Sequence, residues 1–509
     1  MKGLSKSKYT TFCQCPKALW LKVYNSEVEV VEDDRQARFK RGNEIGDLAK
    51  GLFGDFVDVT TKLPPKLPES DLDLSAMINK TKQEMAKGTS VICEASFSYL
   101  GNYCAVDLLR KTDKGWSIYE VKSISSSEPK KFANYYSDIA FQRWVLTQCG
   151  VNVTGTYLVC LNSKYILQET LDLSGLFKQI NVSESIQNEY DKVPDRVQQA
   201  NEVLNCEQEP VIDLSENCKK PHDCTFWNYC TLNLPKPNVF DLYGIGFPFN
   251  KKLDYYRKGD ISFDRLRDMS FNKIRGKQIE AFLTGKAIID PEGIRCFLDT
   301  LSYPIYFLDF ETMALAVPRI KGTRPFQQIP FQYSLHIKES KTAACQHKEF
   351  LAASDGSDPR RSLAEQLCKD IPKNVCTLVF HKDTECNIIK KLAEDFPDLA
   401  NHLMNISNNI KDLLNPFKAG YYYVSAMGGS FSIKSVLPAL FPDDPSLNYH
   451  NLDPLVQNGT EAMSIFPIIK DMTPNEAVAA REALLRYCEL DTFALVKVLE
   501  RLEEVAAGS

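Results

Sequence analysis

The stretch Pro304-Ile-Tyr-Phe-Leu-Asp309-Phe-Glu311-Thr312 has the pattern of a buried β-strand that carries two acids near its end. An unbroken apolar run follows the proline, as in strands that are covered on both faces. Residues two apart in a strand point to the same face, so Asp309 and Glu311 lie side by side. Two like charges on a buried strand are costly unless a cation neutralises them, and a divalent metal ion is the simplest such cation.

The end of the chain places a third acid on a buried face. Tyr487, Asp491, Leu495, Val498 and Leu502 follow one another at steps of three or four residues, which is the spacing of one helical stripe. Asp491 therefore lies on the apolar face of this helix. Tyr487 precedes it by one turn, so the tyrosine hydroxyl and the carboxylate can reach a common point.

A fourth acid follows the apolar strand of residues 378–380. The chain continues as His381-Lys-Asp383-Thr-Glu385, where a helix is expected to begin. Glu385 is the preferred candidate for the site, and Asp383 competes with it. Taken alone, an Asp-x-Glu pair is more often a solvated strand edge than a metal site, so the prediction depends on the acids occurring together.

This order of acids resembles that of the RNase H-like 3′→5′ exonucleases of the tyrosine (DEDDy) subtype. In that family four carboxylates hold two Mg²⁺ or Mn²⁺ ions, and the tyrosine orients the attacking water. The resemblance covers roughly residues 300–505 and includes Gly429-Ser-Phe-Ser-Ile-Lys-Ser-Val-Leu-Pro438, which is similar to a segment that these proteins carry. It implies a catalytic Tyr487 and metal ligands at Asp309, Glu311, Glu385 and Asp491.

A hairpin in the first half of the chain carries a second polar group. Residues 103–110 and 117–122 read as two strands, with a turn at 113–115. Asp107 lies on the first strand, nearly opposite Glu120 on the second, and Lys122 shares the face of Glu120. Such a group predicts a metal site with an adjacent ammonium, and the alternative is a cross-strand salt bridge.

The Asp…Glu-x-Lys pattern resembles the RecB-like branch of the PD-(D/E)xK nuclease superfamily. The resemblance implies metal ligands at Asp107 and Glu120 and catalytic roles for Lys122 and for Gln142 on the following helix. Glu44, on an earlier helix over residues 39–53, is expected to face inward as a further ligand. Relatives place a metal-binding histidine on that helix, whereas here no histidine precedes His222.

Three cysteines of the sixteen recur at equal spacing, at Cys218, Cys224 and Cys230. A fourth thiolate is needed to complete a metal site, and Cys15 before Pro16 is the preferred candidate over Cys13. This arrangement resembles the iron–sulfur RecB-like nucleases, including CRISPR-associated and AddB-type members, and it implies a [4Fe–4S] cluster. Structural Zn²⁺ is the alternative, although close Cys-x₂-Cys pairs are absent.

Residues 251–285 are locally basic in a chain whose net charge is −5. We expect this region to contact nucleic acid backbone, and the alternative is an ordinary solvated helix face. The candidate residues are Lys251, Lys252, Arg257, Lys258, Lys273 and Arg275.

A chain of 509 residues exceeds one compact core, so its length predicts two or three domains. Hydrophobic residues make up 44% of the chain and charged residues 25%, a balance that is typical of globular proteins and argues against disorder. No apolar run reaches the ~18 residues of a membrane helix, and the N-terminus lacks a secretory pattern. We therefore expect a cytoplasmic protein with no membrane partner.

Together the patterns predict an α/β multidomain protein with three regions. These are a RecB-like PD-(D/E)xK domain with an iron–sulfur cluster over 1–233, a helical basic connector over 234–299, and an RNase H-like domain over 300–507. The combination resembles a bacterial family of predicted RecB-like nucleases. It implies a Mg²⁺- or Mn²⁺-dependent nuclease that degrades single-stranded DNA ends 3′→5′, with RNA possible, in repair, recombination or defence against foreign DNA. The alternative is a singly active or non-catalytic nucleic-acid clamp or scaffold, and protein partners cannot be predicted.

Overall fold

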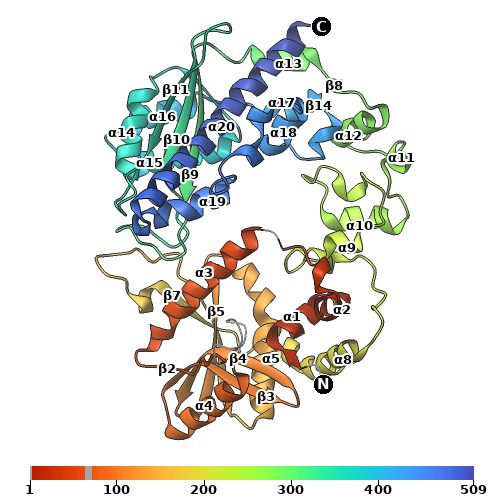
Figure 1. Ribbon diagram of the computed structural model, residues 1–509, viewed down its shortest axis with the longest axis vertical. Coiled ribbons are helices and arrows are strands. Elements are labelled where there is room, and N and C mark those ends of the chain that lie inside the picture. The colour runs from red at the N-terminus through yellow and green to blue at the C-terminus, as the bar shows by residue number, and fades with distance from the viewer. Residues whose placement is uncertain (1–2, 32, 64–71, 509) are drawn as a thin grey trace. The chain divides into compact units, whose positions relative to one another are not determined.

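The computed structural model describes residues 3–31, 33–63 and 72–508, which form two compact units (Figure 1). Unit 1 comprises Met1–Asn233 and Ala316–Phe326, and unit 2 comprises Leu234–Leu315 and Gln327–Ser509. Each unit combines helices with its own sheets, so the predicted mixed α/β multidomain class is confirmed. Residues 234–299 and most of 300–507 share one unit, whereas residues 316–326 belong to unit 1.

Unit 1 is built on a seven-stranded sheet in the order β2-β3-β4-β5-β6-β7, with β1 paired to the start of β4. Its strands are β1 (Leu4–Ser5), β2 (Val57–Asp58), β3 (Val91–Tyr99), β4 (Asn102–Thr112), β5 (Gly115–Ser125), β6 (Val153–Leu161) and β7 (Phe177–Asn181). Its helices are α1 (Lys6–Gln14), α2 (Pro16–Tyr24), α3 (Asp33–Ala49), α4 (Leu74–Lys87), α5 (Tyr136–Gln148), α6 (Leu173–Leu176), α7 (Gln187–Asp191), α8 (Val193–Asn205) and α9 (Trp227–Cys230).

The two faces of this sheet are covered by different helices. Ile118 on β5 packs into a core with Phe141 of α5, whereas Tyr119, the next residue, packs into a second core with Ile45 of α3. The alternation follows from the two-residue period of a strand. Glu120 lies two residues after Ile118, so its side chain is on the same face of the sheet and points toward α5.

Unit 2 contains a five-stranded sheet in the order β11-β10-β9-β12-β13 and a two-stranded pair, β14-β8. Its strands are β8 (Ile288–Ile289), β9 (Ile305–Met313), β10 (Ile329–Lys338), β11 (Gln346–Leu351), β12 (Cys376–Val379), β13 (Ile410–Asp412) and β14 (Tyr422–Tyr423). Its helices are α10 (Phe249–Arg257), α11 (Phe263–Leu266), α12 (Lys273–Thr284), α13 (Pro291–Leu298), α14 (Arg360–Asp370), α15 (Lys382–Asp395), α16 (Ala400–Asn408), α17 (Asn415–Lys418), α18 (Ile433–Leu440), α19 (Gly459–Ile465) and α20 (Pro474–Ala507).

Alternate residues of strand β9 pack on opposite faces of the unit 2 sheet. Tyr306, Leu308 and Phe310 are buried in a core with residues of α14, α15 and α16. The odd-numbered residues, Asp309 and Glu311 among them, point to the other face, where the long helix α20 crosses the sheet (Figure 1). Among the described residues, no helix has the length and apolar character to cross a membrane.

Candidate functional site

Three elements of unit 2 bring four acids to one place. Strand β9 pairs in parallel with β12 only as far as Phe307, so Asp309 and Glu311 lie just beyond the end of that pairing. Strand β12 ends at Val379, and Glu385 stands in the first turn of α15, which begins three residues later. The carboxyl ends of parallel strands meet at one sheet edge, as in other open α/β sheets. Helix α20 adds Asp491 from the face above.

Glu311, Glu385 and Asp491 are buried and Asp309 is half-buried, and burial together with repulsion within the group raises their pKa values. Glu311, Glu385 and Asp491 are 7%, 4% and 8% exposed. Burial, followed by repulsion from Asp491 and Glu385, raises the pKa of Asp309 well above its ordinary value. Burial and the same two acids raise the pKa of Glu311, and burial with Asp491 raises the pKa of Glu385 to about 8. Four acids without matching cations thus form a strongly negative pocket.

One described lysine offsets this charge. The ammonium of Lys434 counteracts the pKa rise of Asp309, Glu311 and Asp491, and its Nζ lies 5.1 Å from the ring centres of both Tyr449 and Tyr487. Lys434 belongs to the Gly429–Pro438 segment that the sequence singled out for its resemblance. Its role at the carboxylates was not predicted, because a single lysine carries no periodic signal.

Two tyrosines stand beside Asp491. The Tyr449 hydroxyl donates to Oδ1 of Asp491 at 2.6 Å, and a hydrogen bond from Tyr487 also lowers the Asp491 pKa. Burial outweighs both bonds and leaves that pKa raised to about 6. Burial, Asp491 and Glu311 raise the pKa of Tyr487, so its phenol stays protonated and acts as a hydrogen-bond donor. Tyr449 lies outside any repeating pattern, and the sequence did not reveal it.

The donor set and one orphaned atom fit a hard divalent cation. Oε2 of Glu385 is buried without a hydrogen-bond partner, although a buried carboxylate oxygen normally has one. Carboxylate oxygens are the ligands that Mg²⁺ and Mn²⁺ prefer. Asp383, the competing candidate, is exposed, whereas Glu385 is buried. Ligand atoms of Asp309, Glu311 and the thiol of Cys488 also lie within 4.8 Å of one another.

The polar group of unit 1 forms where β4 and β5 separate. Their pairing ends at Leu108 and Tyr119, and Oδ2 of Asp107 then accepts the Val121 N–H at 2.7 Å. Glu120 is fully buried and accepts hydrogen bonds from Nζ of Lys122 at 2.5 Å and from Nε2 of Gln142 at 2.7 Å. Four residues named from the sequence, Asp107, Glu120, Lys122 and Gln142, are therefore brought together.

Two further residues complete this group, and the sequence did not reveal either. Strand β1 pairs with β4 at Asn102 and Tyr103, and this pairing places Lys6 directly beside the hairpin. Nζ of Lys6 lies 3.1 Å from Glu120, 3.8 Å from Asp138 and 3.9 Å from Asp107. Asp138 accepts from Lys122 at 3.0 Å.

The charges of this group nearly balance. Burial and the acids Asp107 and Asp138 raise the pKa of Glu120 to about 7. Burial opposes ionisation of Asp138, but the Lys122 and Lys6 ammonium groups hold its pKa well below the usual range. Two ammonium groups thus face Asp107, Glu120 and Asp138, and Glu94 is a fourth acid beside them, whose pKa is raised to about 7 by burial and by Asp107. In unit 2 one ammonium group faces four acids. The need for a metal ion is correspondingly smaller in unit 1.

Glu44 does not face this group, so the expectation that it is an inward metal ligand is wrong. It is exposed, and its Oε1 accepts from Nη2 of Arg319 at 2.8 Å. Helix α3 covers the sheet face that holds Tyr119, whereas Glu120 points toward α5. Residues on opposite faces of a strand cannot meet a common ligand from the same helix.

The four predicted cysteines line one pocket of unit 1. Cys15 caps α2, and Cys218, Cys224 and Cys230 come from the segment around α9. Burial raises the pKa of Cys230 to about 11, and repulsion from Cys224, Cys218 and Cys15 adds to that rise. Cys13 contacts Tyr9 and Arg196 instead. Nε2 of Gln14 joins the two segments by donating to the carbonyls of Asn217 and His222.

Two of the six basic candidates serve the packing of unit 2, so the prediction that they contact nucleic acid is wrong. The Lys252 ammonium is buried and donates to the carbonyl oxygens of Phe240 and Leu242. The Arg275 guanidinium is buried over the Phe247 ring and donates to the carbonyls of Tyr243 and Ile245. Both cations satisfy carbonyls that would otherwise be unpaired, which explains a lysine and an arginine in this core.

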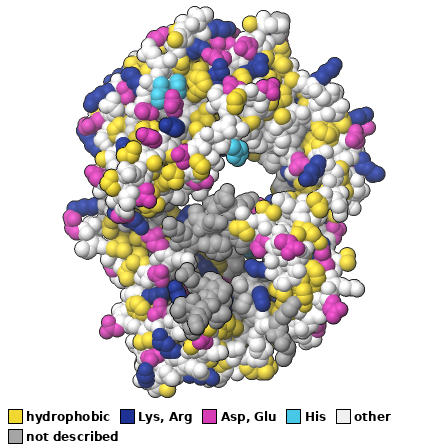
Figure 2. All heavy atoms as spheres, viewed as in Figure 1, with side chains coloured by type: hydrophobic (Ala, Val, Ile, Leu, Met, Phe, Trp, Pro, Cys, Tyr) yellow, Lys and Arg dark blue, Asp and Glu magenta, His cyan; other side chains and the backbone are white. Residues whose placement is uncertain are grey.

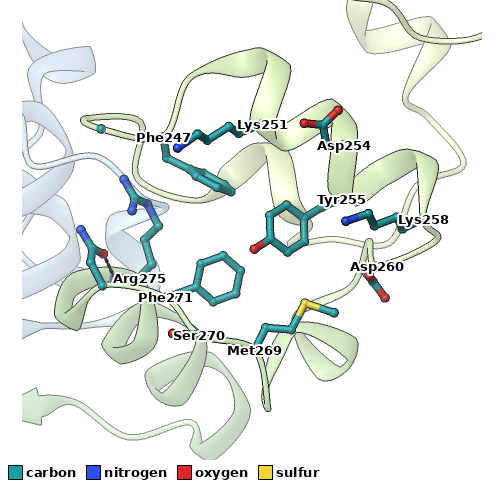
Figure 3. A pocket seen from close by; sticks show the side chains of 12 residues that line it. Phe247, Lys251, Asp254, Tyr255, Lys258, Asp260, Met269, Ser270, Phe271 and Arg275 are labelled. Atoms are coloured by element: carbon teal, nitrogen blue, oxygen red, sulfur yellow. Dashed lines mark hydrogen bonds between the residues drawn. The ribbon is translucent and has the colours of Figure 1, made fainter.

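The other candidates lie at or near the surface. Lys251 and Lys258 line a cavity of about 560 Å³ with Tyr255 and Phe271 (Figure 3). Arg257 lies 3.8 Å from Asp254, and Nζ of Lys273 lies 5.7 Å from the centre of the Tyr421 ring. On the face in Figure 2, basic and acidic side chains are interspersed.

One comparison with known families finds a match. Residues 306–432 match a family model described as Domain of unknown function (DUF2779). The matched segment begins on β9 and includes Asp309, Glu311, Glu385 and the first part of the Gly429–Pro438 segment. No curated protein matches the chain.

Proposed function

We propose that this chain is a metal-dependent nuclease whose active site is the carboxylate cluster of unit 2. The proposal rests on mutual repulsion among four acids that are buried or, for Asp309, half-buried, with Lys434 as the compensating lysine. Such a group is stable at neutral pH when divalent cations occupy it. Phosphodiester hydrolysis is the reaction that paired hard cations in a carboxylate pocket serve best.

Each side chain has a role in this reaction. Asp309, Glu311, Glu385 and Asp491 would hold Mg²⁺ or Mn²⁺, which supplies charge stabilisation at the attacking and leaving oxygens. The Tyr487 hydroxyl donates to Asp491, and its oxygen accepts a hydrogen bond from the attacking water and so orients it. Tyr449 fixes the Asp491 carboxylate, and the Lys434 ammonium attracts the phosphate. Gly459 lies against the site, since a Cβ there would make van der Waals contact with the oxygens of Glu311 and Tyr487 at 3.9 Å and 3.8 Å.

The proposed substrate is DNA with a free single-stranded end, with RNA as a possible second substrate, and the proposed direction is 3′→5′. This part rests on the resemblance of the Asp-x-Glu strand and the Tyr-x-x-x-Asp helix to the DEDDy-type exonucleases of the RNase H-like fold. The exposed Lys251 and Lys258, beside Tyr255 and Phe271, offer charge and ring faces for a single strand. Repair, recombination or defence against foreign DNA in the cytoplasm would use such an activity.

We propose for unit 1 a RecB-like PD-(D/E)xK fold with a [4Fe–4S] cluster on Cys15, Cys218, Cys224 and Cys230. A tetrahedral zinc site, with Zn–S distances of ~2.3 Å, needs sulfur atoms ~3.8 Å apart. Among described His, Cys, Asp and Glu side chains, two groups have ligand atoms within 4.8 Å of one another, and these four cysteines are in neither. The wider spacing supports a larger cluster over Zn²⁺.

A specific observation favours a second role for the unit 1 carboxylates. Lys6 and Lys122 already neutralise most of the charge on Asp107, Glu120 and Asp138. Because a metal ion would have to displace the Lys6 ammonium, unit 1 is proposed to bind nucleic acid without cutting it. A second working nuclease site, with Lys122 and Gln142 as catalytic residues, is the competing proposal.

One assay separates these proposals. Degradation of end-labelled single-stranded DNA in Mn²⁺ is measured for wild type, Asp309→Asn, Lys122→Ala and the exposed control Asp383→Asn. We expect Asp309→Asn to lose at least about 10³-fold in rate, because it removes a metal ligand, while Lys122→Ala and Asp383→Asn keep wild-type rates. Loss of activity in Lys122→Ala would favour a second working nuclease site in unit 1. Absence of cutting by the wild-type protein would favour a non-catalytic scaffold.

A further inference from the structure

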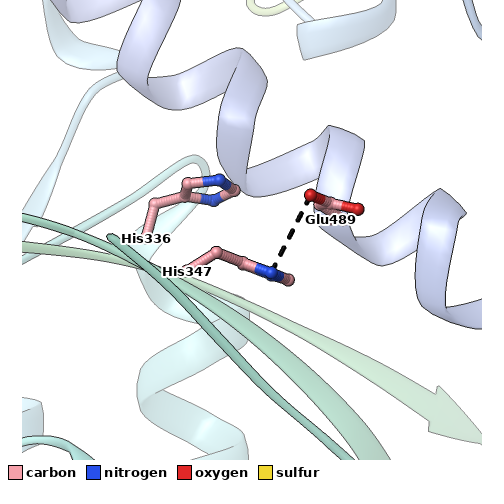
Figure 4. Close-up of side chains that lie close together, drawn as sticks. All are labelled: His336, His347 and Glu489. Carbon is pink, nitrogen blue, oxygen red and sulfur yellow. Dashed lines mark ion pairs between the residues drawn. The ribbon is translucent and has the colours of Figure 1, made fainter. Parts of the chain in front are cut away.

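Two histidines and a glutamate gather on unit 2 outside the carboxylate cluster. His336 on β10 and His347 on β11 are directly paired across the two strands, and Glu489 reaches them from α20 (Figure 4). One ligand atom from each residue lies within 4.8 Å of the other two. Nδ1 of His347 and Oε1 of Glu489 are 3.8 Å apart.

Hydrogen bonds to two hydroxyl groups engage one nitrogen of each imidazole. Nδ1 of His336 lies 2.8 Å from the Thr492 hydroxyl, and Nε2 of His347 lies 2.9 Å from the Ser334 hydroxyl. The two hydroxyl oxygens are 2.6 Å apart. When each engaged nitrogen carries the ring proton, Nε2 of His336 and Nδ1 of His347 hold the lone pairs.

Metal-binding histidines usually have hydrogen-bond partners of this kind. A ligating imidazole normally donates its other N–H to a fixed acceptor, which sets the tautomer and the ring orientation. Each of the two rings has a hydroxyl partner in that place, although the rings come from different strands. Burial and the neighbouring His347 also lower the pKa of His336 to about 4, so this imidazole is neutral and able to bind metal at pH 7.

We propose that His336, His347 and Glu489 bind a divalent first-row transition ion, of which Zn²⁺ is representative. Two imidazole nitrogens and one carboxylate oxygen form a zinc donor set that leaves a fourth position to solvent. The side chains of His347 and Glu489 are 24% and 50% exposed, so an ion can enter. Nitrogen donors distinguish this site from the oxygen-rich carboxylate cluster, which suits Mg²⁺ or Mn²⁺.

A bound ion would connect α20 to β10 and β11. Helix α20 also carries Tyr487 and Asp491, and Gln332 on β10 already donates to the Leu484 carbonyl on the same helix at 2.9 Å. Through Glu489, the ion adds a second link between this helix and the sheet, five residues beyond Leu484. The proposed site therefore stabilises the packing of the helix that holds part of the carboxylate cluster, and its occupancy is independent of nuclease activity.

Zinc content per chain tests the proposal directly. The full-length protein is stripped of loosely bound metal and dialysed against Zn²⁺ in excess Mg²⁺, which keeps the carboxylate cluster occupied by the harder ion. Wild type is compared with His347→Gln, Glu489→Gln and the exposed control His450→Gln. All four proteins keep every cysteine, so zinc that is bound to thiols contributes equally to the zinc content of each.

We expect His347→Gln and Glu489→Gln to bind one zinc ion fewer per chain than wild type and His450→Gln. We also expect Zn²⁺ to raise the thermal midpoint of wild type and His450→Gln more than that of the two site variants, since binding to the native state stabilises it. Equal zinc content and equal thermal shifts in all four proteins would overturn the proposal. Thermal melts without added Zn²⁺ show whether each variant is folded, since the Glu489 side chain is half-exposed and that of His347 is partly buried.

Discussion

Charge repulsion among buried acids is the main property of unit 2 at the scale of single residues. Asp309, Glu311, Glu385 and Asp491 lie in a protein interior where an unpaired carboxylate is costly, and each has a raised pKa. A carboxyl whose pKa is raised on folding holds its proton more tightly in the native state. It therefore stabilises the protein at low pH and loses this effect as pH rises through its folded pKa.

A pH series tests this repulsion through Glu385. Its pKa rises on folding from an ordinary ~4.3 to about 8, so metal-free protein loses stability between pH 4 and pH 8. We expect the thermal midpoint of Glu385→Gln to fall less over this range than that of wild type, by several degrees, because the amide has no charge to bury. Saturating Mg²⁺ should remove most of the difference.

The exposed neighbour Asp383 supplies the matched control. Asp383 lies in the same helix turn as Glu385 but is exposed to solvent. The thermal midpoint of Asp383→Asn should therefore equal that of wild type at every pH. Identical pH profiles for Glu385→Gln and wild type would show that Glu385 does not carry the repulsion.

Periodicity made part of the site predictable from sequence. Asp309 and Glu311 were found by the two-residue period of a strand, and Tyr487 and Asp491 by the helical stripe. Lys434 and Tyr449 were not found, because each is a single residue in irregular sequence whose position is set by chain topology. The orientation of Glu44 was predicted wrongly, since a helical stripe does not reveal which sheet face its helix covers.

At the scale of elements, the cysteine pocket joins the first helices of unit 1 to its last. Cys15 stands at the start of α2, about 200 residues before Cys218, Cys224 and Cys230, so a shared metal group closes a very long loop. Gln14 reinforces the same junction through two backbone carbonyls. The equal spacing of the three later cysteines made this pocket predictable, and the proline after Cys15 selected the fourth member.

Replacement of Cys15 tests the shared group. We expect Cys15→Ser to lose the broad visible absorption of an iron–sulfur cluster near ~400 nm. We also expect the unit 1 unfolding midpoint to fall by about 6–12 °C, which corresponds to a loss of about 3 kcal/mol. Absorption spectra of anaerobically purified protein and thermal melts give both readouts.

Cys13→Ser is the control for this prediction, because Cys13 lies two residues away but contacts Tyr9 and Arg196. It should keep the absorption. If Cys13→Ser loses the absorption and Cys15→Ser keeps it, the assignment of the fourth ligand is reversed. A colourless wild-type protein that contains zinc would replace the cluster with a zinc site.

At the scale of the whole molecule, the two units are not consecutive in sequence. Residues 316–326 leave unit 2 and complete unit 1, where Ala316 and Val317 are buried in a core with Tyr165 and Leu176. The Leu167 N–H donates to the Thr323 carbonyl at 3.0 Å. The sequence predicts a boundary between residues 233 and 234, but a short returning segment has no compositional signature.

Because residues 316–326 belong to unit 1, we expect unit 1 to be less stable when the chain is truncated after residue 233. A fragment of residues 1–233 exposes the core surface that Ala316 and Val317 cover and loses the bonds to Thr323. We expect its thermal midpoint to lie about 4–8 °C below the unit 1 transition of the full chain, which corresponds to about 2 kcal/mol. Equal midpoints would show that residues 316–326 add nothing to the stability of unit 1.

Binding of divalent metal by Asp309, Glu311, Glu385 and Asp491 can be measured by anomalous scattering from Mn²⁺-soaked crystals of the full chain. We predict at least one strong manganese peak bounded by these four carboxylates, within ~2.0–2.3 Å of their oxygens, and its absence in Asp309→Asn. A map with no manganese between them, and with the four carboxylates turned apart into solvent, would contradict the account.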